Sequence, residues 1–483
     1  MSEISTLDPR SVWEQFDAIT KVPRPSKKEE KIIAWLIEFA KSHNLEYKRD
    51  KIGNVVIKAP ATAGFEKSPI VILQSHVDMV CEKNSDVIFD FEHDAIRMRI
   101  VDGWIKADGT TLGADCGIGM AAALAVLIDP AVEHGPIEAL FTVDEETGLT
   151  GAFELEDGML QGKHLINLDS EDEGELFIGC AGGIDTVATF NFHSVTSPST
   201  YSFFRVDVSD LQGGHSGDDI NKGRANSNKI VARLLWEGIN SFDLRLCYFD
   251  GGNLRNAIPR EAYAIFGVPK SLHDQFVERY NLFALDIEAE FRLCEPNFKI
   301  ALNQMPHIDN MIDLESQTSL INALVGLPNG VISMSAAVEG LVETSTNLAS
   351  VKFVGSDKIV VTTSQRSSVE SAKTYAMQMV ESVFSLGGAD VTHSDGYPGW
   401  APNPSSDLLR LTTESYRSLF SVEPLVKAIH AGLECGLFLE KYPDLDMISF
   451  GPTLRGVHSP DERLEIASVD KFWRLLCDLL KRI

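Results

Sequence analysis

Between residues 26 and 168 the apolar positions switch repeatedly between helical and strand spacing. Apolar residues recur on one helix face over 31–40, which predicts a helix there. Ser26 and Glu29 precede it in the order of a capping box. Short apolar runs predict strands, and an Ala-, Leu- and Met-rich segment at 117–128 predicts a buried helix; the strand runs are 55–57, 70–73, 137–143 and 165–168. This alternation indicates an α/β domain with a mixed sheet flanked by helices.

Near residue 187 the pattern changes. Strand-like alternation over 201–208 leads into Gly-Gly-His-Ser-Gly at 213–217 and then into a helical pattern over 225–237. Two strands and a helix follow in each of two series, at 244–249, 262–268 and 272–291, and at 349–354, 358–363 and 368–384. We therefore expect an inserted α+β lid domain over 187–396, internally duplicated.

The segment Tyr-Pro-Gly-Trp-Ala-Pro at 397–402 marks the return to the first domain. A helix is predicted at 408–419, a strand at 447–450 and a last helix at the end of the chain. We expect the first domain to be discontinuous, with residues 1–186 and 397–483. A chain of 483 residues exceeds what one hydrophobic core usually supports, which also favours two domains.

Charge and cysteine usage narrow the class of protein. The net charge of −27 opposes binding to nucleic acid and to anionic membrane surfaces. The seven cysteines are scattered singly, without a CxxC pair, so we expect free thiols in a reducing compartment. The N-terminus lacks the features of a secretory signal, and no apolar stretch approaches the length of a membrane span. These features predict a cytoplasmic protein.

Acidic and imidazole side chains stand at the ends of the predicted strands or at the start of the next helix. They are His76, Asp78, Asp115, Glu145, Glu146, Asp169 and His458. Open α/β sheets place their sites at these positions. Two imidazoles with several carboxylates are suited to two zinc ions or similar divalent metals. His458 can join the others only if the chain folds back onto the first domain.

Neighbouring residues in this set predict divided roles. His76 and Asp78 point to the same face of a strand, so Asp78 can orient the ring of a metal-bound His76. Glu145 and Glu146 would repel each other unless one binds metal and the other holds a proton. Taken alone, a His-x-Asp tripeptide is equally typical of a local stabilising pair. Taken alone, the acidic residues 144–146 are more typical of a solvated turn. Together the sites favour a metallohydrolase with Asp115 shared between two metals.

The motifs around these residues resemble those of the two-zinc peptidases, the family that includes aminoacylases, succinyl-diaminopimelate desuccinylases and carnosinases. The motifs are His-x-Asp at 76–78, Leu-Gly-Ala-Asp at 112–115, Glu-Glu at 145–146, Asp-Ser-Glu at 169–171 and Gly-x-His-Ser-Pro at 456–460. Further matching segments at 179–185, 213–217, 255–260 and 430–436 extend the resemblance over essentially the whole chain, towards members that cleave Xaa-His dipeptides.

The resemblance implies a role for each site residue. It places the metal ligands at His76, Asp115, Glu146, Asp169 and His458, with Glu145 as general base and Asp78 as the acid that orients a histidine. It also implies two Zn²⁺ per chain, with Co²⁺ or Mn²⁺ able to substitute. In the lid, His215 would stabilise the oxyanion and Arg366 would bind the substrate carboxylate, with Asn256 as a further substrate-binding residue. Cys116 replaces the Asn or Gly more usual in relatives.

We therefore expect hydrolysis of dipeptides that have a free C-terminal carboxylate, Xaa-His dipeptides such as carnosine included. Deacylation of N-acyl amino acids on the same fold is the alternative reaction, and a non-catalytic metal- or peptide-binding protein is the alternative class. The expected partner is a small peptide, neither nucleic acid nor a membrane, and a homodimer is left open. Because the lid is duplicated, we expect His215 and Arg366 to act within one chain, although relatives with a single-module lid borrow this histidine from a dimer partner.

Overall fold

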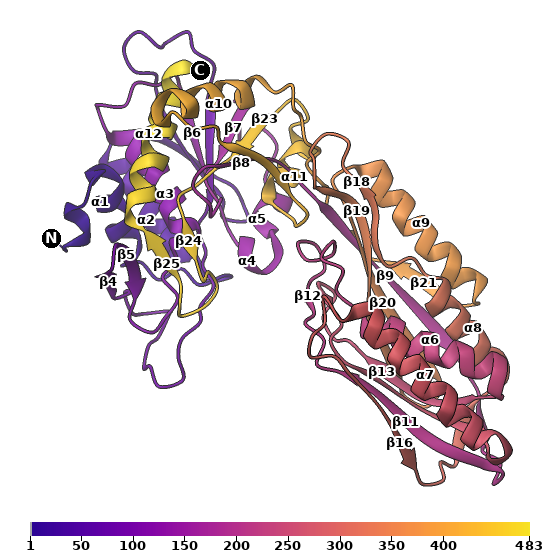
Figure 1. The fold of residues 1–483 in the computed structure, drawn as a ribbon. Helices are drawn as coiled ribbons and strands as arrows, with labels where there is room; N and C mark the ends of the chain where they lie inside the picture. The colour runs from indigo at the N-terminus through magenta and orange to yellow at the C-terminus, as the bar shows by residue number, and fades with distance from the viewer. Residues whose placement is uncertain (1) are drawn as a thin grey trace. The chain divides into compact units, whose positions relative to one another are not determined.

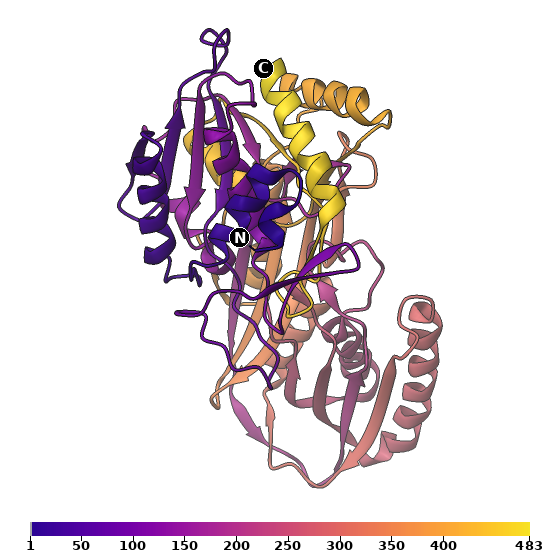
Figure 2. The same ribbon diagram turned by 90° about the vertical axis from the view of Figure 1, so that its left-hand side faces the viewer.

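The computed structural model describes residues 2–483, and the chain forms two compact units (Figures 1 and 2). The first unit contains the chain up to Gly179, Pro402–Ala428 and Leu433–Ile483. The second contains Cys180–Ala401 and the short segment Ile429–Gly432. The boundaries expected from sequence, 187 and 396, lie inside the second unit. Residues 429–432 were expected in the first domain but belong to the second unit. They are held there because the backbone N–H of Ala181 donates to the carbonyls of Ile429 and Ala431.

A mixed eight-stranded sheet forms the centre of the first unit, as predicted. Its order is β1 (Glu46–Arg49), β2 (Val55–Ala59), β6 (Ile137–Thr142), β3 (Val71–His76), β7 (His164–Asn167), β23 (Asp446–Ser449), β8 (Glu175–Cys180) and β22 (Leu425–Ile429). Strands β6, β3, β7 and β23 run parallel. Their carboxyl ends therefore lie along one edge of the sheet, and β3 and β6 are buried at every position, as expected for parallel strands.

Helices surround this sheet. They are α1 (Arg10–Ile19), α2 (Glu30–Ser42), α3 (Ala114–Ile128), α4 (Glu145–Gly148), α5 (Thr150–Glu154), α10 (Asp407–Phe420), α11 (Glu434–Lys441) and α12 (Ile466–Arg482). The almost wholly apolar α3 packs between β3 and α1, which accounts for its lack of a polar face. A four-stranded sheet of β24 (Leu454–Arg455), β25 (Arg463–Glu465), β5 (Trp104–Ala107) and β4 (Met98–Val101) completes the unit.

One local prediction in this unit is wrong. The N-cap of α2 is Glu29, and no side chain caps it. Instead, the hydroxyl of Ser26 donates to Asp78 Oδ2 at 2.8 Å, and Glu29 Oε1 accepts from the backbone N–H of Lys27. A tertiary contact with a buried carboxylate therefore replaces the local capping box.

The second unit is built on a nine-stranded sheet. Its order is β16 (Lys299–Met305), β11 (Tyr201–Ser209), β15 (Ala262–Pro269), β13 (Arg245–Gly251), β19 (Val342–Val354), β20 (Lys358–Ser367), β9 (Gly182–Asn191) and β21 (Asp390–His393), with β18 (Gly330–Met334) on β19. Helices α6 (Ser227–Phe242), α7 (His273–Phe291), α8 (Leu314–Gly326) and α9 (Glu370–Leu386) lie along one face of this sheet (Figures 1 and 2).

The predicted duplication is present as topology. One half runs β11, α6, β13, β15, α7, β16, and the other runs β9, α8, β19, β20, α9, β21, each with its third strand between its first and second. The halves meet where β13 pairs with β19. They are nested rather than consecutive, because the whole first half lies between β9 and α8 in the chain. Sequence analysis did not predict α8 and placed the start of the insert within β9.

Two further findings concern the whole described chain. None of the helices within residues 2–483 combines the length and the apolar character needed to cross a membrane. All seven cysteines are free thiols, and Cys116 is buried with its Sγ donating to the carbonyl of Leu168.

Candidate active site

The seven candidate side chains predicted from sequence in this unit lie together at the carboxyl edge of the first sheet. His76 is the last residue of β3, Glu145 and Glu146 open α4 after β6, and Asp169 follows β7 by two residues. Asp115 lies in the first turn of α3, where the backbone is not yet helical. His458 stands between β24 and β25 in a left-handed conformation, with φ of 61°, which is costly for a residue that carries a Cβ.

Asp115 lies between two histidine–carboxylate pairs. Its Oδ1 is 3.2 Å from His76 Nε2, which is also 3.4 Å from an oxygen of Asp169. Its Oδ2 is 3.1 Å from His458 Nε2, which is also 3.0 Å from an oxygen of Glu146. The two oxygens of one carboxylate therefore face two separate sets of candidate ligands.

This arrangement fits a pair of metal ions. The groups Asp115, Glu146 and His458, and His76, Glu145 and Glu146, each bring ligand atoms within 4.8 Å of one another. In the described part of the chain, Glu146 Oε1 is buried without a hydrogen-bond partner. Unpaired buried carboxylate oxygens are costly unless a cation satisfies them.

Asp78 contacts His76 as well as the backbone of Glu145 and Glu146. Its carboxylate is fully buried, lies 3.4 Å from His76 Nδ1 and accepts the backbone N–H groups of Glu145 and Glu146 at 3.0 and 3.2 Å. Burial opposes ionisation of this carboxyl, but the hydrogen bonds from His76, Glu145 and Ser26 lower its pKa to about 2. Asp78 is therefore an anion that orients both the imidazole and the first turn of α4.

Two further buried groups at this edge, Glu145 and His76, have pKa values shifted from their ordinary range. Burial raises the pKa of Glu145 well above its ordinary value; His76 opposes the shift, and Asp169, Glu434 and Glu146 add to it. Burial would lower the pKa of His76, but Asp169, Asp115 and Asp78 raise it well above its ordinary value. The buried carboxyl of Glu145 therefore has an environment that favours its protonated form.

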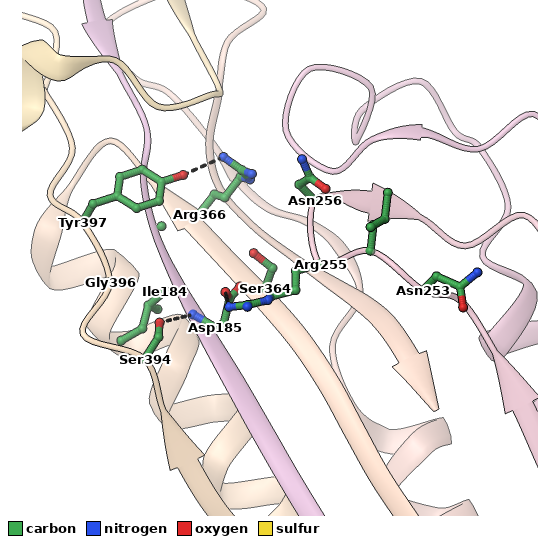
Figure 3. A pocket seen from close by; sticks show the side chains of 12 residues that line it. Ile184, Asp185, Asn253, Arg255, Asn256, Ser364, Arg366, Ser394, Gly396 and Tyr397 are labelled. Carbon is green, nitrogen blue, oxygen red and sulfur yellow. Dashed lines mark hydrogen bonds and ion pairs between the residues drawn. The ribbon is translucent and has the colours of Figure 1, made fainter. Parts of the chain in front are cut away.

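Arg366 and Asn256 line a cavity of about 410 Å³ in the second unit (Figure 3). Arg366 is 7% exposed, and its Nη1 donates to the hydroxyl of Tyr397 at 2.9 Å. No ion pair joins Arg366 to a carboxylate within residues 2–483, whereas Arg255 in the same cavity is paired with Asp185 at 2.9 Å. A buried guanidinium without an anion at a cavity wall is suited to bind a carboxylate from a ligand.

His215 is held next to these two residues. It lies in β12 (Gly214–His215), which pairs with β14 (Ala257–Ile258) directly after Asn256. The next residue, Ser216, accepts from Arg366 Nε and donates its backbone N–H to Asn256. The backbone N–H groups of Gly217 and Asp218 point at His215 Nδ1, and Asp218 Oδ2 lies 3.5 Å from the same atom, so neighbouring residues occupy Nδ1 and Nε2 is the ring nitrogen that can face a ligand.

Sequence analysis missed four residues that contact these sites. Tyr397 opens the segment that was read only as the return to the first domain. Glu434 lies in the matching segment 430–436 and is buried against Gln74 and Thr142. Arg24 and Glu462 had no such signal. Both are buried and bind backbone groups of the ligand-bearing segments, which no sequence spacing reveals.

Known proteins are similar to this chain in sequence and in fold. The chain is 43% identical to the cytosol non-specific dipeptidase of Escherichia coli (strain K12) over 483 residues, covering all of this chain and 99% of the relative. The crystal structure of aminoacylhistidine dipeptidase from Vibrio alginolyticus superposes with a TM-score of 0.95 at 43% identity, over 100% of this chain and 98% of that one. A tripeptidase from Staphylococcus aureus, at 16% identity, a TM-score of 0.57 and coverage of 99% and 98%, shares the fold.

The model of the peptidase family M20/M25/M40 matches residues 72–482, a range that includes all seven side chains at the sheet edge. The resemblance to aminoacyl-histidine dipeptidases is confirmed by the identity over the full length, and the prediction of a peptide hydrolase is confirmed by the family. The chain belongs to the peptidase family M20/M25/M40.

Proposed function

We propose that this peptidase is a metal-dependent dipeptidase that cleaves dipeptides with a free C-terminal carboxylate, Xaa-His dipeptides such as carnosine included. The position of Asp115 carries the proposal, because its two oxygens face two histidine–carboxylate pairs. His76, Asp115 and Asp169 would hold one ion, and His458, Asp115 and Glu146 the other. Zinc is our first choice because imidazole and carboxylate ligands suit it, and Co²⁺ or Mn²⁺ should substitute.

The remaining residues supply proton transfer and binding. Two divalent cations, when bound, would lower the pKa of water and polarise the scissile carbonyl. Glu145 takes the proton of the attacking water on its carboxylate and returns it to the leaving amine. Asp78 keeps the ring of His76 oriented through Nδ1, so that Nε2 faces Asp115 and Asp169.

We assign substrate contacts to the second unit. The unpaired guanidinium of Arg366 would bind the terminal carboxylate, Asn256 would contribute a polar contact in the same cavity, and the Nε2–H of His215 would donate to the oxyanion. The names of the two 43% identical relatives support dipeptide substrates for this chain, and the name of the Escherichia coli relative supports a cytosolic location.

Metal removal combined with a substrate panel tests the proposal. Chelation should abolish dipeptide hydrolysis, and Zn²⁺, Co²⁺ or Mn²⁺ should restore it, with metal content measured by elemental analysis. Turnover of β-Ala-His compared with acetyl-His separates a dipeptidase from a deacylase. Full activity in a preparation shown to be metal-free would contradict the proposal, and preference for acetyl-His would favour the deacylase.

A further inference from the structure

Arg24 is a buried cation that joins two of the ligand-bearing segments. Its side chain is 1% exposed and lies in the connection between α1 and α2. Nη1 donates to the carbonyls of Val77 and Asp78 at 2.9 and 2.7 Å, and Nη2 donates to the carbonyl of Gly113. One guanidinium therefore ties the segment after His76 to the loop that precedes Asp115.

The loop before Asp115 is shaped to admit this guanidinium. A Cβ at Gly113 or at Gly117 would lie 2.7 Å from Nη2 of Arg24, closer than Cβ atoms approach other atoms in proteins. Gly113 also has a φ of 68°, a conformation that other residues rarely adopt. The space between the two glycines is filled by the planar fork of Arg24, which a lysine cannot reproduce.

Glu462 is a buried anion that holds the same loop from the C-terminal part of the chain. It is 2% exposed, and its Oε2 accepts the backbone N–H groups of Leu112 and Gly113 at 2.7 and 3.0 Å. Its Oε1 accepts from Ala114 and Asp115 at 2.8 and 3.4 Å. Glu462 follows His458 by four residues, so this contact connects the loop of one candidate ligand to the loop of another.

We infer that Arg24 and Glu462 are positioning residues that together hold Asp115 between His76 and His458, and thereby set the affinity of the chain for its metals. The inference rests on the proposed function. Buried charges are retained at low cost only where their hydrogen bonds are satisfied, and the bonds of these two side chains converge on backbone of residues 77–78 and 112–115. Neither side chain reaches a ligand atom, so both act through the backbone.

The test compares two isosteric substitutions. In Glu462→Gln an NH2 group replaces one carboxylate oxygen and faces backbone N–H donors. The loop before Asp115 thereby loses one of the two oxygens that accept its N–H groups. The matched control is Glu138→Gln. Glu138 is also 2% exposed and accepts the N–H groups of Gln161 and Gly162, but it lies near the start of β6, whereas the ligands follow the end of that strand.

The readouts are the stoichiometry and dissociation constant for Zn²⁺ and Co²⁺, the visible spectrum of the Co²⁺ protein, and the melting temperature of the metal-free protein. We expect Glu462→Gln to weaken metal binding by about 10- to 100-fold, the range for groups that orient ligands, and to change the Co²⁺ spectrum. Glu138→Gln should lower the melting temperature and leave both metal readouts at wild-type values. Arg24→Lys, which keeps the charge but loses the fork, should weaken metal binding in the same direction.

The outcomes separate this inference from the proposed function. Wild-type affinity and spectrum in folded Glu462→Gln and Arg24→Lys, with two metals bound to the wild-type chain, would overturn the positioning role and leave the proposed function intact. Equal loss of affinity in Glu462→Gln and Glu138→Gln would show a general effect on stability and would also overturn it. A wild-type chain that binds no metal would refute the proposed function itself.

Discussion

Glu145 and Glu146 are adjacent glutamates in the same first turn of α4, yet their carboxylates have different surroundings. Glu146 lies 3.0 Å from His458, whereas burial raises the pKa of Glu145 well above its ordinary value. We predict that Glu145→Gln keeps its metals and loses about 10²–10⁴-fold in kcat, the usual contribution of a positioned general base. Metal analysis and steady-state kinetics check this.

Glu146→Gln is the matched control for this prediction. It makes the same chemical change one residue away and should lower metal content, because Glu146 Oε1 is one of the unpaired buried oxygens. Turnover near the wild-type rate in Glu145→Gln would show that another group moves the proton.

Arg366 and Arg255 line the same cavity but differ in their partners. Arg366→Ala should raise KM for free dipeptides about 10- to 100-fold, since hydrogen bonds between charged groups contribute roughly 1.5–3 kcal/mol. KM for C-terminally amidated dipeptides should change little, because they present no carboxylate. Arg255→Ala is the control, because this residue is already paired with Asp185 and its side chain is 67% exposed. An equal rise in KM for free and amidated substrates would contradict the assignment.

At the level of elements, local sequence patterns were sufficient to predict helices and strands whose burial is visible in their own residues. The strands predicted at 70–73, 137–143 and 165–168 correspond to β3, β6 and β7, because buried parallel strands are continuous apolar runs. The prediction of a capping box at Ser26 was wrong because the Ser26 hydroxyl donates instead to Asp78, a buried carboxylate from a distant segment. The nesting of the two halves of the second unit was also missed, since β9 is separated from α8 by a whole repeat.

The segment Ile429–Gly432, which joins the second unit, carries a buried histidine that should make stability depend on pH. Burial, with the charge of Arg366, lowers the pKa of His430 to about 4, and its Nε2 lies 2.7 Å from the hydroxyl of Ser345. An unfolded histidine has a pKa near 6.5. Between these values the unfolded chain binds a proton that the folded chain does not, so the free energy of unfolding falls as pH falls.

We predict that the melting temperature decreases as the pH falls from about 6.5 to about 4. Over this range His430 should lower the free energy of unfolding by about 3 kcal/mol. His430→Gln can still bond Ser345 but cannot take up this proton, so its pH profile should be flatter. His93→Gln, at a histidine whose side chain is 69% exposed, should retain the wild-type slope. Parallel profiles for His430→Gln and the wild-type chain would contradict the prediction.

For the whole molecule, the duplicated second unit predicts that each chain uses its own His215. This chain contains both halves of the second sheet, with His215 between β11 and α6 of one half and Arg366 in β20 of the other. His215→Ala should mainly lower kcat, because an oxyanion donor acts in the transition state. Mixing His215→Ala with Glu145→Gln under subunit-exchange conditions should give no more activity than the two variants separately.

Recovery of activity in that mixture would show that His215 acts across chains. Mixing Glu145→Gln with Glu146→Gln is the control, because both residues belong to the first unit and no exchange of second units can restore either. Size-exclusion chromatography of each mixture reports whether the chains associate at all.

The sequence by itself determined which residues could perform chemistry and that two domains of different class are present. The ends of predicted strands, short motifs and the spacing of apolar residues are local properties of the chain, so they can be recognised without a structure. Only the tertiary structure decided that the two oxygens of Asp115 face different histidines, and that Ser216 joins Arg366 to Asn256. These relations depend on contacts between segments far apart in the chain, and on buried groups such as Arg24 and Glu462 that bind backbone atoms. Backbone atoms are the same at every residue, so no pattern of side chains along the sequence marks the partners of these groups.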